Sequence, residues 1–315
     1  MKNSYIKESV IAQLIRITGP DRVRRNEPMC RHTTMKVGGN AALYISPGSV
    51  AQISGVVRLL QEEGIGFFVL GNGSNVICRD EGYAGAVICL SDYYKGYRVL
   101  QSAGASHDGT VIVSVKAGTD NRHFSDVCVR RGFSGFEFAS GIPGSLGGAT
   151  AMNAGAYDGE MKHIVQRVRL LDLEGNVISR SCEEMQFGYR HSLVTGGGYI
   201  ILETVLRLTE KDPQLIRTTV DDLTRRREAK QPLEYPSCGS TFKRPEGYFA
   251  GKLISDAGMK GFRLGGAQVS EKHAGFVINR DGASASDVLA LIDRVKKAVM
   301  DDSGVELECE VKILG

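Results

Sequence analysis

The chain has 315 residues, of which 42% are hydrophobic and 24% are charged, and its formal net charge at pH 7 is +3. This length suggests two or three domains, and the composition is typical of a globular protein. The small net charge excludes binding to nucleic acid or acidic membranes through overall charge, and no apolar run reaches the roughly 20 residues of a membrane helix.

Cysteine and histidine residues give no sign of a metal centre. The seven cysteines are scattered without a CxxC pair, and the six histidines, including His107, have neither triad nor metal spacing. The charged residues Lys2, Lys7 and Glu8 also leave no room for the apolar core of a signal peptide. We therefore expect no metal, no disulfide framework and a reducing cytoplasmic location.

Up to about residue 210, short strands alternate with a few helices. Residues 5–17 have helical spacing, residues 22–28 look like a polar connection, and residues 31–45 resemble a strand interrupted by Gly38 and Gly39. The remaining pattern predicts two helices, from residue 49 to Gly64 and over residues 120–131. It also predicts strands over residues 67–70, 86–90, 110–117, 167–173 and 199–208, with a hairpin turn at residues 174–176.

The C-terminal part begins at a boundary near Pro213, which suits the first turn of a helix. Helices are predicted over residues 213–230, 249–257 and 286–300, with a strand following residues 265–279. Residues 305–313 alternate without exception, so we predict one strand with the carboxylates of Glu306, Glu308 and Glu310 on one face. The mixture indicates an α+β fold rather than a regular βαβ repeat.

Two glycine-rich segments stand out. Residues 132–159 contain eight glycines among apolar and aromatic residues, which suits either a series of tight turns or main chain wrapped around a flat ligand. Residues 71–75, GNGSN, lie between two predicted strands and suit either a hairpin turn or a diphosphate-binding loop. The pentapeptide matches neither the GxGxxG dinucleotide pattern nor the Walker A pattern.

Six segments in order resemble one family, the UDP-N-acetylenolpyruvoylglucosamine reductases, in the shorter form that lacks a tyrosine-bearing insertion. They are RHTTMKVGG, LGNGSNVI, GFEFASGIPGSLGGATAMNAGAY, FGYRHS, CGSTFKRP with GGAQVSEKHAGFVIN, and LECEVKI. The resemblance implies an FAD-binding unit of the vanillyl-alcohol-oxidase type, made of two α+β subdomains, over residues 31–210. An N-terminal helix and connection would occupy residues 1–30, and a smaller α+β substrate domain residues 211–315.

The resemblance also implies the residues that bind FAD. The diphosphate would be held by Gly71, Asn72, Gly73, Ser74 and Asn75, and the flavin by Gly141, Ile142, Pro143, Ser145 and Asn153, with Thr34, Lys36 and Gly38 in a first flavin-side loop. Five further residues, Tyr189, Lys243, Arg244, Lys252 and Lys260, could meet the phosphates of a sugar nucleotide or of NADPH, because anions need local cations.

The implied reaction is the NADPH-dependent reduction of an enolpyruvyl ether of UDP-N-acetylglucosamine to UDP-N-acetylmuramate, a step of peptidoglycan synthesis. Hydride would pass from flavin N5 to C3, Ser240 would protonate C2, and Arg190 and Glu310 would stabilise the enolate charge. We expect a monomer with no nucleic-acid or membrane partner. Two rivals remain open: an FAD-dependent oxidase or dehydrogenase of a sugar or alcohol on the same scaffold, and a flavin-binding module without turnover.

Overall fold

The computed structural model describes residues 6–105 and 108–315, so Tyr5, at the start of the predicted first helix, and His107 lie outside the described residues. The helices are α1 (Glu8–Thr18), α2 (Val50–Glu62), α3 (Asn121–Arg131), α4 (Leu146–Ala151), α5 (Pro213–Lys230), α6 (Ala250–Asp256) and α7 (Ala285–Ser303). The longer strands are β1 (Val23–Pro28), β2 (Asn40–Ile45), β3 (Phe67–Leu70), β5 (Tyr83–Cys89), β6 (Tyr97–Gln101), β7 (Thr110–Lys116), β11 (Val165–Asp172), β12 (Val177–Ser181) and β13 (Tyr199–Glu210). The short strands are β4 (Val76–Cys78), β8 (Phe133–Ser134), β9 (Gly155–Ala156), β10 (Gly159–Glu160), β14 (Arg263–Leu264), β15 (Ala267–Val269), β16 (Val277–Asn279) and β17 (Lys312–Leu314).

The contacts divide the chain into two compact units that are discontinuous in sequence. The first unit comprises Met1–Arg25, Leu43–Asn72 and Gly85–Arg226, and the second comprises Asn26–Ala42, Gly73–Ala84 and Arg227–Gly315. Two segments of the N-terminal half therefore belong to the same unit as the C-terminal residues. The predicted functional limits at residues 30 and 210 stay a prediction.

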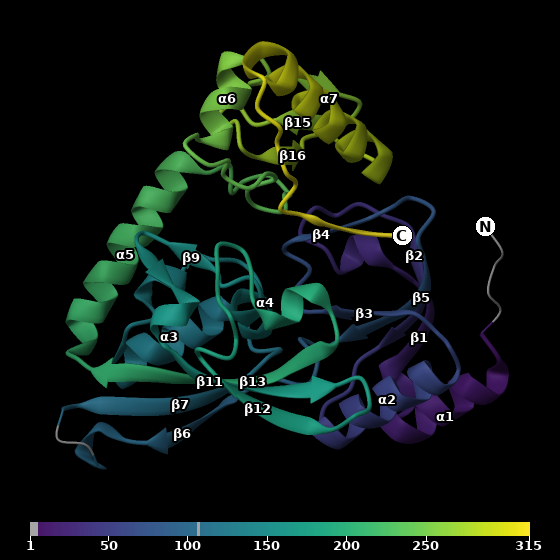
Figure 1. Cartoon of the computed structure of the whole chain (residues 1–315), viewed down its shortest axis with the longest axis vertical. Coiled ribbons are helices and arrows are strands. Elements are labelled where there is room, and N and C mark those ends of the chain that lie inside the picture. Colours follow the sequence, from purple (N-terminus) through teal and green to yellow (C-terminus); the bar gives the residue numbers. More distant parts are fainter. Residues whose placement is uncertain (1–5, 106–107) are drawn as a thin grey trace. The chain divides into compact units, whose positions relative to one another are not determined.

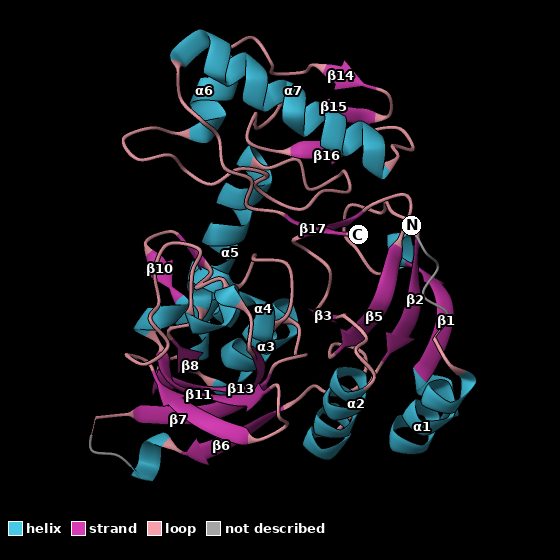
Figure 2. Cartoon of the chain, turned by 45° about the vertical axis from the view of Figure 1, so that its right-hand side comes forward, coloured by secondary structure: helices cyan, strands magenta, loops and turns pink. Residues whose placement is uncertain are grey.

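The first unit contains the larger sheet and a mixed set of helices. Strands β12-β11-β13-β7-β6 follow one another in that order, with β8 paired to β13, and α4 packs on β13 and β7. Figure 2 shows α3 and α4 on one face of this sheet, and α1 beside α2 at the sheet ordered β1-β2-β5-β3. Phe124 of α3 packs edge to face on Phe136, with 5.0 Å between the two ring centres. This contact anchors the start of the glycine-rich stretch in the core.

The second unit is built on the antiparallel sheet β14-β15-β16, which α7 covers and α6 flanks (Figure 1). The helix predicted over residues 286–300 is confirmed as α7, and its apolar face, Val288, Leu291, Ile292, Val295 and Val299, is buried. The helix begins with a capping box between Ser284 and Asp287 and ends at Gly304 in the left-handed conformation.

Four features differ from the expectations. Residues 23–28 of the predicted connection form β1, β6 was not predicted, and a short helix, α4, interrupts the glycine-rich stretch. The prediction of one continuous strand over residues 305–313 was wrong. Only Lys312–Leu314 form a strand, β17, which pairs in parallel with β4, and Ile313 is 44% exposed. The side-chain alternation is lost after Val311, because the chain there leaves one antiparallel partner and joins a parallel one.

Candidate active site

The GNGSN loop connects β3 to β4, and Gly73 is packed against the segment before Lys36. A Cβ at Gly73 would lie 1.9 Å from the carbonyl oxygen of His32, and the residue has a φ of +64°. The main-chain N–H of Thr34 donates to the carbonyl of Gly73 over 3.1 Å. Two segments predicted to bind the cofactor, about 40 residues apart in the chain, are therefore in direct contact.

Asn75, at the end of the same loop, is bonded to the C-terminal segment. Its side-chain N–H donates to the carbonyl of Glu310 over 3.2 Å, and its own carbonyl accepts from the N–H of Lys312 over 3.0 Å. The predicted diphosphate loop thus fixes the main chain on which Glu310 lies.

Ser240 and Glu310 come from neighbouring antiparallel segments. The N–H of Glu310 donates to Thr241, and the N–H of Lys243 donates to Glu308, both over 2.9 Å. The Thr34 hydroxyl donates to the carbonyl of Ser237 over 2.6 Å, which ties the Ser240 segment to the first predicted flavin loop. Ser240 and Glu310 are both half-buried, so each side chain has partial access to solvent.

In the first unit, the glycine-rich run meets residues 71 and 72 of the GNGSN loop. A Cβ at Gly71 would lie 2.2 Å from the hydroxyl oxygen of Ser145, which itself caps α4 by accepting from Gly148. Asn72 donates to the carboxylate of Asp120 over 2.7 Å, and Asp120 forms a β-bridge with Ser145. Sequence reasoning missed Asp120, although its position before α3 is a recognisable N-cap signal.

Other members of the run differ in exposure. Pro143 is exposed, Gly141 and Ile142 are half-buried, and Ser145 is buried. The N–H of Asn121 donates to the carbonyl of Gly144 over 3.0 Å, which fixes this stretch on the start of α3. Within the second unit, Lys36 is exposed with a φ of +58°, and Ser74 and Gly38 are half-buried.

Arg190 lies in a tight turn of the first unit. The N–H of Gly188 donates to His191 over 3.1 Å and the reciprocal bond is 3.3 Å, while Arg190 has a φ of +53°. A left-handed conformation is unfavourable for arginine, so it persists only where the surroundings impose it. The Arg190 guanidinium lies 5.4 Å from the ring centre of Tyr189, which is 56% exposed.

The four predicted phosphate-binding cations of the second unit are not gathered on one element. Lys243 forms an ion pair with Glu308, and Lys252 pairs with Asp256 over 2.6 Å. Arg244 lies 4.0 Å over the ring of Phe249, and Lys260 is exposed. Tyr189 and Arg190 belong to the first unit, whereas these cations, Ser240 and Glu310 belong to the second.

The groups that converge in each unit suit a dinucleotide with a flat ring. They are main-chain amides of glycine-rich loops, hydroxyls and carboxamides, the kinds of N–H and O–H donor that diphosphate-binding sites use. In the described ranges, 6–105 and 108–315, no cluster of His, Cys, Asp and Glu could hold a metal ion. Within that same part of the chain no helix is long and apolar enough to cross a membrane.

Comparisons with known proteins match both parts of the chain. Residues 41–181 match the FAD binding domain family, and residues 231–314 match the family described as UDP-N-acetylenolpyruvoylglucosamine reductase, C-terminal domain. The first match covers segments of both compact units, as the GNGSN loop itself does.

Whole-length relatives carry the same name. The chain is 46% identical over 308 residues to the UDP-N-acetylenolpyruvoylglucosamine reductase of Clostridioides difficile, and equally so to that of Geobacillus thermodenitrificans, with 98% of each chain covered. The crystal structure of the reductase from Thermus caldophilus superposes with a TM-score of 0.76 at 32% identity, covering 93% of this chain and 99% of that one.

A more distant likeness concerns the fold alone. A VAO-type flavoprotein from Myceliophthora thermophila gives a TM-score of 0.50 at 11% identity over 65% of this chain and 48% of its own. The predicted α+β fold with a VAO-type FAD-binding unit is confirmed by these matches. The chain belongs to the UDP-N-acetylenolpyruvoylglucosamine reductase family and is an oxidoreductase.

Proposed function

We propose that this protein uses NADPH and bound FAD to reduce the enolpyruvyl group of UDP-N-acetyl-3-O-(1-carboxyvinyl)glucosamine, giving UDP-N-acetylmuramate for peptidoglycan synthesis. Membership of the family and the match to an FAD binding domain support the reaction class and the cofactor. The bonding of the predicted cofactor loops to the Ser240 and Glu310 segments within one compact unit is the observation that carries the proposal.

When bound and reduced by NADPH, FAD would supply the hydride that C3 of the enolpyruvyl group requires. Ser240 donates the proton that C2 then requires, and its segment is held for this by Thr241, whose carbonyl accepts from Glu310. Arg190 pairs with the substrate carboxylate, where negative charge accumulates, and Glu310 contributes to the same stabilisation as an acid or hydrogen-bond partner. The exposed ring of Tyr189 and the cations Lys243, Arg244, Lys252 and Lys260 are proposed contacts for phosphates.

The ion pairs of Lys243 and Lys252 refine this assignment. Each lysine already has a carboxylate partner in its own unit, so binding a phosphate requires that the partner be exchanged or shared. Because these pairs are solvent-exposed, they contribute little to stability and exchange at small cost. Both lysines therefore remain suitable as contacts that form when the nucleotide binds.

Stopped-flow absorbance tests the proposal. NADPH should bleach the flavin band at about 450 nm, a property of the cofactor itself, and anaerobic addition of the enolpyruvyl sugar nucleotide should restore it. Ser240→Ala should retain the bleaching and slow the recovery by about 10²-fold or more. The control Ser255→Ala changes an exposed serine on α6 and should leave both phases intact. Recovery of Ser240→Ala at the unchanged rate would refute the role of Ser240.

The same experiment separates the rival functions. An oxidase or dehydrogenase of a sugar or alcohol would have its flavin reduced by that substrate, and an oxidase would be reoxidised by oxygen. A binding module without turnover would show no recovery on adding the sugar nucleotide. The family match over nearly the whole chain argues against both.

A further inference from the structure

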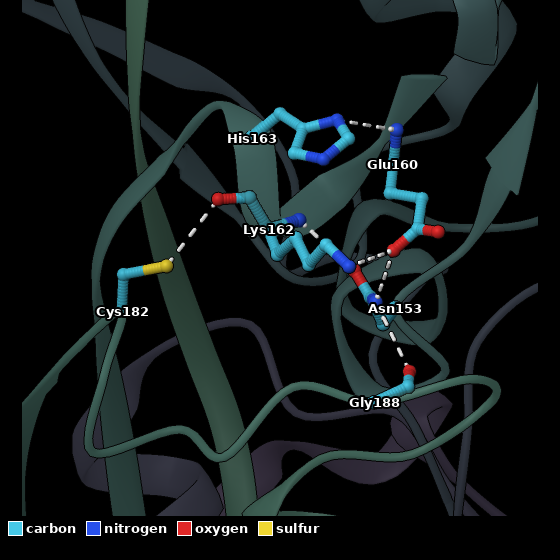
Figure 3. Close-up of polar contacts among 6 residues, drawn as sticks. All are labelled: Asn153, Glu160, Lys162, His163, Cys182 and Gly188. Carbon is cyan, nitrogen blue, oxygen red and sulfur yellow. Dashed lines mark hydrogen bonds and ion pairs between the residues drawn. The ribbon is translucent and has the colours of Figure 1, made fainter. Parts of the chain in front are cut away.

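Asn153, predicted as a flavin contact, has its side chain engaged inside the protein. The residue is 2% exposed, and its amide N–H groups donate to the carboxylate of Glu160 over 2.9 Å and to the carbonyl of Gly188 over 3.0 Å (Figure 3). Its side-chain oxygen accepts from the N–H of Lys162 over 2.9 Å. A carboxamide has only two N–H donors, so in Asn153 both are taken by groups of this chain.

The partners fix which way the carboxamide faces. A carboxylate and a carbonyl only accept hydrogen bonds, so the NH₂ side must point to Glu160 and Gly188, and the oxygen must point to the N–H of Lys162. Glu160 is itself held by an ion pair with Lys162 over 2.9 Å, and its N–H donates to the ring of His163 over 3.3 Å. Glu160, the carboxylate partner of Asn153, is therefore itself bonded to two neighbouring residues.

Gly188 is the first residue of the turn that carries Arg190. The turn runs from Gly188 to His191, and its far end is fixed in the same way, because the Ser192 hydroxyl donates to the carbonyl of Ala151 over 2.6 Å. Ser192 is completely buried. Two hydrogen bonds from buried side chains, one on each side of Arg190, thus join the turn to residues 151 and 153 of the glycine-rich run.

These two hydrogen bonds account for the left-handed backbone conformation of Arg190. Its φ of +53° is unfavourable for a side chain with a Cβ, so the conformation persists only where the surroundings impose it. Asn153 supplies one of these constraints and, with a φ of +40°, is of the residue type that best tolerates the left-handed region after glycine.

We propose that Asn153 is a positioning residue that acts through Arg190: it holds the Gly188 carbonyl and so presents the Arg190 guanidinium from a turn whose main chain is joined to the glycine-rich run. The inference rests on the proposed function, which gives Arg190 its part in turnover. It replaces direct flavin binding by Asn153 with an indirect role in the second half-reaction.

A double-mutant cycle tests the inference. Asn153→Gly removes the carboxamide but tolerates the positive φ, and it is made in the natural protein and in Arg190→Ala. The readouts are the FAD content, the rate of bleaching by NADPH, and the anaerobic rate at which the enolpyruvyl sugar nucleotide restores the flavin colour. The matched control is Asn26→Gly, an exposed asparagine with a φ of +48°.

We expect Asn153→Gly to slow the recovery on the order of 10- to 100-fold at saturating substrate, the scale of a misplaced catalytic group. FAD content and bleaching should stay normal, and in Arg190→Ala the same change should cost less than about twofold, because the group being positioned is gone. Ser192→Ala, which releases the other end of the turn, should follow the same pattern, and Asn26→Gly should change none of the readouts.

Three results would overturn the inference in distinguishable ways. An equal loss in both backgrounds would mean that Asn153 acts independently of Arg190. Loss of FAD from Asn153→Gly, with Ser192→Ala still loaded, would restore direct cofactor binding. A natural recovery rate in Arg190→Ala alone would remove Arg190 from turnover, and the fault would then lie in the proposed mechanism itself.

Discussion

A single methyl group at Gly73 should disturb both the fold and the cofactor loop. In Gly73→Ala the new Cβ would lie 1.9 Å from the His32 carbonyl oxygen and 2.9 Å from the Thr33 Cα. Both obstacles are main chain, so rotation of a side chain does not relieve the contact. Gly64 provides a matched control, because it has the same φ of +64° and nothing within 4 Å of its missing Cβ.

The two substitutions separate backbone strain from steric overlap. The left-handed conformation of an alanine costs about 1–2 kcal/mol, and this cost is common to both variants. Displacing packed main chain adds about 1–3 kcal/mol to Gly73→Ala alone. The same shift moves the Gly73 carbonyl away from the N–H of Thr34, so the loop should also bind FAD less tightly.

Thermal unfolding and FAD content measure the two effects. We expect Gly64→Ala to retain its flavin through gel filtration, and Gly73→Ala to lose part or all of it. The midpoint of Gly73→Ala should lie below that of Gly64→Ala by about 2–4 °C for each kcal/mol of difference. Equal midpoints together with full flavin in both variants would refute the packing argument.

Two other predictions concern stability and thiol chemistry. Asp80 accepts from the N–H groups of Ala285 and Ser286 and from the Ser286 hydroxyl, at 2.6–2.8 Å; burial acts to raise its pKa, but these hydrogen bonds outweigh it and lower the pKa. Because it removes the carboxylate that accepts from the first N–H groups of α7, Asp80→Ala should cost about 1 kcal/mol at pH 7, the scale of a lost helix-terminus acceptor at a solvent-screened site. A lowered folded-state pKa stabilises the protein above the unfolded value of about 3.9. The difference, measured by urea unfolding, should shrink as the pH falls through the folded-state pKa, and a pH-independent difference would contradict this reasoning. Burial raises the pKa of Cys78 and of Cys89 to about 11 and that of Cys238 to about 12, and it also raises the pKa of Cys128. Ellman's reagent at pH 8 should therefore label at most three of the seven thiols before denaturation and all seven after it. Rapid labelling of more than three thiols in the folded protein would show that its core is open.

The elements that the sequence predicted well have strong periodic signals and caps. Helix α2 begins after Ser49, whose hydroxyl accepts from Gln52, and α7 has a complete buried stripe. Strands β1 and β6 were not predicted from the sequence because each is an edge strand of its sheet, where one side of the strand needs no apolar residues. Val99 and Leu100 of β6 are more than one-third exposed, so the burial pattern itself is weak there.

Helix α4 illustrates tertiary context overriding propensity. Its sequence, LGGATA, contains two glycines, which disfavour a helix. It forms because Ser145 caps its start and because Leu146 and Ala149 are buried against the larger sheet. A single sequence gives the composition of this stretch but not the surface on which it packs.

The site residues were found through motifs, whereas their connections needed the structure. The bond from Thr34 to Ser237 spans 203 positions and that from Asn75 to Glu310 spans 235, and no local pattern encodes such pairs. Asn153 shows the opposite difficulty. Its surroundings suggested main chain open to a ligand, yet its side chain is bonded to Glu160 and Gly188.

These connections change how a loss of activity at the cofactor loop should be interpreted. Asn75 belongs to the predicted diphosphate loop, but it also bonds the main chain of Glu310 on one side and accepts from Lys312 on the other. A substitution there alters the position of a proposed catalytic carboxyl group together with any contact to FAD. FAD affinity and the rate of substrate reduction must therefore be measured separately, because only a change confined to the affinity identifies a residue whose sole task is to hold the cofactor.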